Sequence, residues 1–217
     1  MNFLNAFLEA VIVSVGFYIT IYFFNNRAEL GIECNGFFMK SRSVNIVAVI
    51  NFFAAGYISY ARLAAFYMPL HILTLILIYG MSVLAVTDRI KKLVPNKFLL
   101  ALLLLWAGIT GLAVIFDIEG GLELLGRGIG GAAAGGIIFL LCYLISGHQL
   151  GAGDVKLAFI MGLYMTGQRI MGGITYGVLL CCVYSVVQLL RKRLGMKDGV
   201  ALVPFLYLGV LITLIII

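Results

Sequence analysis

The sequence predicts an all-α, polytopic membrane protein, a bundle of about eight transmembrane helices. Of its 217 residues, 63% are hydrophobic and only 11% are charged, and the mean hydropathy is +1.13. Too few polar side chains exist to cover a soluble globule of this size. The apolar residues also form long stretches, and a membrane span needs about 20 mainly apolar residues because its backbone amides must pair within the helix. The lipid bilayer is therefore the expected solvent.

The N-terminal part, residues 1–65, contains two predicted helices and one polar loop. The first helix is predicted at 3–24 and is interpreted as a retained span, since the sequence lacks a basic start and a small-residue cleavage signal. The longest polar interval, 25–43, follows it, and the second helix is predicted at 44–61. No CxxC pair occurs in the sequence, so we expect neither a zinc site nor a disulfide framework.

The remaining part, residues 66–217, contains six more predicted helices. The fifth of the eight is rich in glycine, and Gly131 and Gly135 have the small-xxx-small spacing that allows close helix contact. The sixth reaches the length of a span only if the polar residues before Val155 are included. The six predicted helices cover residues 66–87, 98–116, 128–147, 149–167, 170–190 and 200–217.

The net charge of +6 reflects basic residues that occur in short clusters between the apolar segments. They do not form one face, so we expect no nucleic acid partner, and membrane topology explains them better. Short cytoplasmic loops carry an excess of lysine and arginine. The side predicted to be cytoplasmic receives Arg27, Lys40, Arg42, Arg89, Lys91, Lys92, Lys97, Lys156, Arg191, Lys192, Arg193 and Lys197.

Two aspartates are the strongest candidates for chemistry, because ionisable residues in membrane spans are costly and usually face a partner or a cavity. Asp88 ends the third predicted helix, and Asp154 follows Gly151 and Gly153 at the start of the sixth. The fourth and fifth helices cross the membrane between them. Two crossings return the chain to the same side, so both carboxyl groups are expected at one depth on the cytoplasmic side.

Two carboxyl groups that meet at one depth can share a proton, since like charges at close range cannot both ionise cheaply. One then acts as a base and the other as an acid in peptide hydrolysis, without a metal or cofactor. Gly151 and Gly153 would let a substrate backbone approach. The alternative is structural: an aspartate at a helix end is often a cap, and Asp88 beside Arg89 could be a solvated ion pair.

The segment Gly151-Ala152-Gly153-Asp154-Val155-Lys156 resembles the GxGDxK motif of the prepilin peptidase and preflagellin peptidase family, aspartyl proteases of the GxGD group. Asp88 is followed by Pro95 and Asn96, as the first aspartate of that family is followed by a proline seven positions later. Val203-Pro204-Phe205 is similar to the family's proline-phenylalanine segment. The resemblance covers residues 66–217, the expected peptidase core, and assigns catalysis to Asp88 and Asp154, with Gly151, Gly153, Lys156 and Pro95 in support.

The resemblance implies removal of a short basic leader from pilin-like or pseudopilin-like precursors, in type IV pilus assembly or protein secretion. It places the protein in the cytoplasmic (inner) membrane of a prokaryote, with cleavage at the cytoplasmic face. The loop 25–43 contains Cys34 alone, where many relatives carry a domain with paired cysteines, so this is a short form and N-methylation of the product is left open. Lys156 either favours the ionised form of Asp154 or is an interfacial lysine. The particular precursor and the oligomeric state are not predicted.

Two other functions remain as alternatives. In an ion-coupled transporter the same aspartates would bind a cation or relay protons, which requires polar groups along the path. The outer halves of the predicted helices are expected to hold almost none. The second alternative is an inactive scaffold of a secretion system. A cleavage assay separates the three functions.

Overall fold

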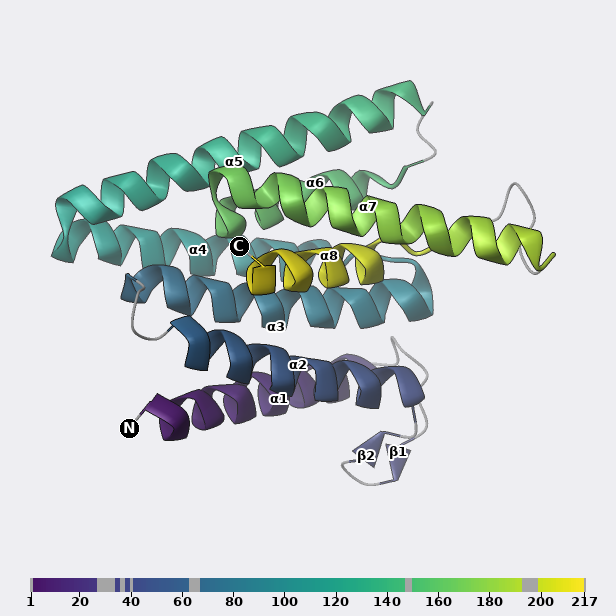
Figure 1. The fold of residues 1–217 in the computed structure, drawn as a ribbon, viewed down its shortest axis with the longest axis horizontal. Helices are drawn as coiled ribbons and strands as arrows, with labels where there is room; N and C mark the ends of the chain where they lie inside the picture. The colour runs from purple at the N-terminus through teal and green to yellow at the C-terminus, as the bar shows by residue number, and fades with distance from the viewer. Residues whose placement is uncertain are drawn as a thin grey trace.

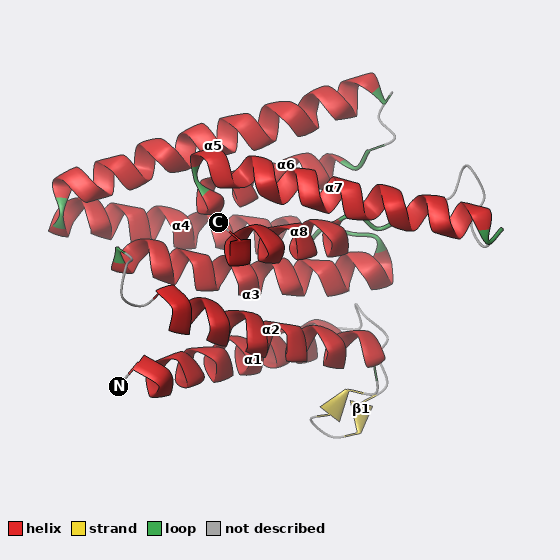
Figure 2. Ribbon diagram, viewed as in Figure 1, coloured by secondary structure: helices red, strands yellow, loops and turns green. Residues whose placement is uncertain are grey.

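The computed structural model describes residues 2–26, 34–35, 38–39, 41–62, 67–146, 150–192 and 199–216. Within these residues the chain forms eight helices and one minimal hairpin, in which β1 (Cys34–Asn35) pairs antiparallel with β2 (Phe38–Met39) (Figures 1 and 2). The prediction of an all-helical membrane bundle is confirmed. The helices are α1 (Asn2–Asn26), α2 (Arg42–Arg62), α3 (Met68–Lys91), α4 (Asn96–Phe116), α5 (Ile118–Ile145), α6 (Ala152–Met165), α7 (Gly167–Leu190) and α8 (Val203–Ile216).

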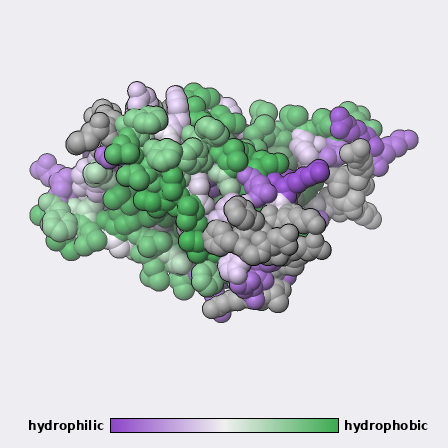
Figure 3. Space-filling model, turned by 90° about the horizontal axis from the view of Figure 1, so that it is seen from below, coloured by the Kyte–Doolittle hydropathy of each residue, from purple (hydrophilic) through white to green (hydrophobic). Residues whose placement is uncertain are grey.

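Among the described residues, six helices are long and apolar enough to cross a membrane: α1 to α5 and α7. The other two, α6 and α8, have 14 residues each. At 1.5 Å per residue they are about 21 Å long, shorter than a hydrocarbon core of about 30 Å. Figure 3 shows hydrophobic residues over the middle of one face and hydrophilic residues towards both ends, as expected for a protein that lies across a bilayer.

The predicted helix boundaries agree with the structure to within a few residues, except for the start of α5. Helix α5 begins at Ile118, well before residue 128, because Asp117 caps it by accepting a hydrogen bond of 3.2 Å from the N–H of Gly120. The charged first turns therefore belong to the helix, although only the later part is apolar. Helix α6 begins at Ala152 rather than 149, and residues 147–149 lie outside the described part of the chain.

The central helix of the bundle is α3. It contacts α1, α2, α4, α6 and α8, and Figure 1 shows α1 and α2 on one side of it and α4 and α5 on the other. Every residue from Met81 to Asp88 is buried. We call the end of the bundle where α3 ends and α4, α6 and α8 begin the aspartate end, because both candidate aspartates lie there.

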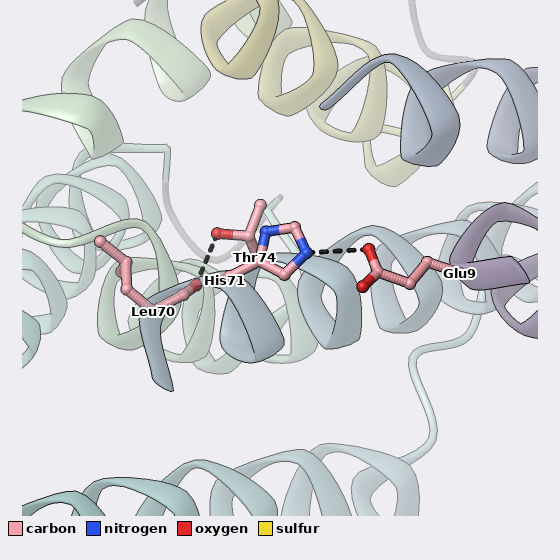
Figure 4. Close-up of polar contacts among 4 residues, drawn as sticks. All are labelled: Glu9, Leu70, His71 and Thr74. Carbon is pink, nitrogen blue, oxygen red and sulfur yellow. Dashed lines mark hydrogen bonds and ion pairs between the residues drawn. The ribbon is translucent and has the colours of Figure 1, made fainter. Parts of the chain in front are cut away.

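A polar pair lies towards the opposite end of α3, where the sequence was expected to provide almost none. The Nε2 atom of His71 lies 2.9 Å from Oε2 of Glu9 on α1, and the His71 side chain is only 7% exposed. Figure 4 shows the two side chains directed towards one another, with Thr74 bonded to the Leu70 carbonyl of its own helix. Because a buried polar group needs a partner, this contact ties α1 to the central helix.

Candidate active site

The first candidate residue, Asp88, lies in the last turn of α3. The helix ends when Lys92 adopts a left-handed conformation, with φ 51°, and donates its N–H to the Asp88 carbonyl at 2.8 Å. The Asp88 carboxyl points into the bundle, where the residue is 6% exposed. Its Oδ2 accepts a hydrogen bond of 3.1 Å from the N–H of Val203.

This hydrogen bond makes Asp88 a cap for another helix, since Val203 is the first residue of α8. The first N–H groups of a helix have no partner within it, and a carboxylate there is stabilised by the helix dipole. Pro204 follows, and it has no N–H to compete. The Nζ of Lys92 donates to the carbonyl of Gly199 at 2.8 Å, so a second contact fastens the segment before α8 to the end of α3.

The second candidate, Asp154, lies in the first turn of α6 and is partly buried. Its N–H donates to the carbonyl of Gly151 at 3.0 Å, and its carboxyl accepts a hydrogen bond from the Gly151 backbone. A Cβ at position 151 would lie 3.2 Å from Oδ2 of Asp154, and a Cβ at position 153 would lie 3.2 Å from Cβ of Val94. The two glycines therefore let the start of α6 pack tightly against its own carboxyl and against the α3–α4 connection.

The structure brings the two aspartates together. They come from α3 and α6, which are in contact, and the Asp154 carboxyl lies within electrostatic range of Asp88. Both lie at the aspartate end, as the two intervening crossings by α4 and α5 require. Like charges within this range disfavour simultaneous ionisation of both groups. Two carboxyl groups at the same end of two contacting helices form the candidate catalytic pair.

The depth of Asp154 follows from the antiparallel contact of α5 and α6. A Cβ at Gly131 would lie 2.3 Å from the carbonyl oxygen of Gly162, so these residues face one another. Asp154 lies eight residues before Gly162 on α6, and Phe139 lies eight residues after Gly131 on α5. Because the two helices run antiparallel, Asp154 is level with Phe139. That level is nearly two turns, about 9 Å, before α5 ends at Ile145. The carboxyl group thus lies short of the end of α5, in the first turn of its own helix.

The other two supporting residues, Pro95 and Lys156, lie at the aspartate end of the bundle. Pro95 precedes the first residue of α4 in an extended conformation, with φ −68° and ψ 117°, and ends the short connection from α3. The Nζ of Lys156 donates to Oδ1 of Asn96 at 3.1 Å. The lysine thus fastens α6 to α4, a contact that neither of its two predicted roles includes.

One contact of the candidate site was not identified from the sequence: the hydrogen bond from Val203 to Asp88. The segment Val203-Pro204 was noted only for its resemblance, and the sequence contains no signal for the partner of its N–H. As for metals, no group of three or more histidine, cysteine, aspartate or glutamate side chains lies together among the described residues.

Comparison with known proteins gives one match. The sequence profile of the type IV leader peptidase family matches residues 75–186, which is 112 of the 217 residues and includes both aspartates. No curated protein and no solved structure matches the chain. The two candidate aspartates, Asp88 and Asp154, lie within the matched segment and at the same end of the bundle. Because the match covers more than half of the sequence, the chain belongs to the type IV leader peptidase family.

Proposed function

We propose that this chain is an aspartic endopeptidase in which Asp88 and Asp154 form the catalytic pair. Membership of the family makes it a leader peptidase-like protease, and its helices make it a multi-pass membrane protein. The observation that supports the aspartic mechanism is the placement of Asp88 on α3 and Asp154 on α6, two helices in contact, at the same end of the bundle and within electrostatic range.

In the proposed mechanism the pair holds one proton. The ionised carboxylate takes a proton from water as the water oxygen attacks the carbonyl carbon of the peptide bond. The protonated carboxyl donates its proton to the carbonyl oxygen, which gives a neutral tetrahedral intermediate. The carboxyl that received the water proton then passes it to the nitrogen, so that the amine leaves and the C–N bond breaks. The other carboxylate takes back a proton from one hydroxyl of the intermediate as that oxygen becomes the carbonyl oxygen of the new carboxyl group. The pair is then ready for another cycle, and only water is consumed.

The proposed substrate is a pilin-like precursor whose short basic leader is removed at the cytoplasmic face of the inner membrane. Orientation supports this face, because exposed basic residues gather at the aspartate end, as the positive-inside rule requires of cytoplasmic loops. They include Arg89, Lys91, Lys92 and Lys97. We further propose that residues 66–217 form the peptidase core, which contains the matched segment.

Ion-coupled transport has less support. A transport path would need polar groups that continue along α3 from Asp88. Ser82 and Thr87 are buried on this helix, but their hydroxyl groups donate to the carbonyls of Tyr79 and Leu84 at 2.7 and 3.0 Å. These bonds are made within the helix, and the buried His71 of α3 bonds Glu9 of α1 towards the opposite end, so these polar groups do not form a continuous hydrogen-bonded chain from the aspartate.

Cleavage by the purified protein tests the proposal. A pilin-like precursor with a basic leader and an apolar helix is incubated with the wild-type protein, Asp88→Asn or Asp154→Asn, and the products are measured by mass spectrometry. We expect the wild-type protein to release the leader and both variants to be inactive while still folded. Asp117→Asn, at the opposite end of the bundle, is the matched control and should cleave normally. Activity retained in either aspartate variant would remove the pair from the mechanism.

A further inference from the structure

A groove with a volume of about 710 Å³ lies between α4, α5 and α6. Two of its lining residues, Val155 and Lys156, directly follow Asp154. From there the groove continues along α6 to Ile160 and along α4 from Asn96 to Leu103. It therefore begins beside the candidate active site and leads from the aspartate end towards the middle of the bundle.

The lining changes character along the groove. Lys156 and Asn96, hydrogen-bonded to each other, are its polar residues, and both lie at the aspartate end. Deeper in, the walls are apolar, with Leu100 and Phe159 56% and 44% exposed. The α5 wall includes Ala132, Ala133 and Gly136, whose small side chains leave room for a helix backbone to approach closely.

We propose that this groove binds the apolar helix of the substrate, the segment that follows the cleaved bond. The inference rests on the proposed function, because it takes the cleaved bond to lie at Asp88 and Asp154. A precursor cut there must continue into the bilayer from the level of Asp154, and the groove is an apolar surface that starts at that level and runs in that direction. Its occupant is therefore a protein helix with apolar side chains.

The polar end of the groove fits the same occupant. A peptide bond can be hydrolysed only where the backbone leaves the helical conformation, and the freed N–H and C=O groups then need partners at membrane depth. The Lys156 ammonium and the Asn96 amide lie at the entrance, next to the residue that follows Asp154. They can bond this non-helical stretch, while the apolar walls hold the helix after it.

The test fills the groove and compares two substrates. Ala133→Trp on the α5 wall and Leu100→Trp on the α4 wall each place an indole in the groove. Ile129→Trp is the control, on the same helix as Ala133 but outside the groove lining and 54% exposed. One substrate is the complete precursor in lipid vesicles, and the other is a peptide of the leader and the first residues after the cleaved bond, without the apolar helix.

We expect both groove variants to raise KM for the complete precursor at least about tenfold, and to leave kcat/KM for the short peptide unchanged. Ile129→Trp should match the wild-type protein with both substrates. Unchanged KM for the complete precursor in folded groove variants would overturn the groove proposal and leave the proposed function standing. If the wild-type protein cleaved neither substrate, the proposed function itself would fail, and the groove proposal with it.

A photocrosslinker identifies the occupant. Benzoylphenylalanine replaces Ala133 in the Asp154→Asn variant, which retains uncleaved precursor, and is irradiated in vesicles with the precursor present. An adduct with the precursor helix supports the proposal, provided that the same label at Ile129 gives much less. Adducts only with lipid, or only with a second copy of the chain, would show that another molecule fills the groove.

Discussion

Replacing one glycine with alanine should inactivate the enzyme by moving Asp154. A Cβ at Gly162 would lie 2.2 Å from the carbonyl oxygen of Gly131, whereas ordinary contact begins at 3.4 Å. In Gly162→Ala the two helices must therefore separate by about 1.2 Å, since a backbone oxygen cannot turn aside as a flexible side chain can. A misplacement of about 1 Å at a catalytic group can cost about 100-fold in rate.

The expected result is a decrease of about 100-fold in kcat for precursor cleavage by Gly162→Ala. Gly130→Ala is the control, because a Cβ at that exposed position of α5 meets no atom within 4 Å. It tests the effect of alanine on a helix without displacing α6. Thermal unfolding in detergent establishes that both variants are folded. A folded Gly162→Ala protein with wild-type kcat would refute the view that this contact sets the position of Asp154.

Three further substitutions test individual contacts. Incorporation of the α-hydroxy analogue of valine at position 203 replaces the amide with an ester and removes the N–H that bonds Asp88. We expect kcat to fall about tenfold with KM unchanged, since a hydrogen bond to a charged group contributes about 1.5–3 kcal/mol. Glu9→Ala leaves the buried His71 without its carboxylate partner, so the free energy of unfolding should fall by about 1–3 kcal/mol. In a folded sample kcat should stay normal, because this pair lies towards the end of α3 opposite the aspartates. Lys156→Met should raise KM, because the ammonium lies at the entrance of the groove, and should leave kcat nearly unchanged, because the ammonium bonds Asn96 rather than the candidate acid. An equal loss in kcat would contradict this role.

Most of the helical architecture could be predicted from the sequence, because the bilayer restricts a spanning segment to an apolar helix of defined length. The start of α5 was missed for a physical reason. Asp117, Glu119 and Arg127 are charged, and this pattern in the sequence is typical of a polar loop. In the structure Asp117 caps the helix, and the charged residues after it belong to helical turns that precede the apolar part. Hydropathy locates the part of a helix in lipid and does not detect turns that project into water.

The candidate site was predictable to the level of its two aspartates. Two predicted membrane crossings between them placed Asp88 and Asp154 on the same side of the membrane. The GxGDxK motif and the spacing from Asp88 to Pro95 identified them as the candidate catalytic residues. The contacts that hold them were not predictable, since Val203 lies far along the chain from Asp88 and the two meet only when α8 packs on α3. The pair of Glu9 and His71 was missed for the same reason, because each residue alone is an isolated polar group in an apolar segment.

The central claim is that the two carboxyl groups share one proton, and infrared spectroscopy can count it. The difference spectrum between the wild-type protein and the Asp88→Asn, Asp154→Asn double variant, recorded at neutral pH, contains the signals of these two groups. The shared proton predicts one protonated carboxyl and one carboxylate. Two carboxylates, or two protonated carboxyls, would contradict the account, because the pair would then lack either the acid or the base that hydrolysis requires.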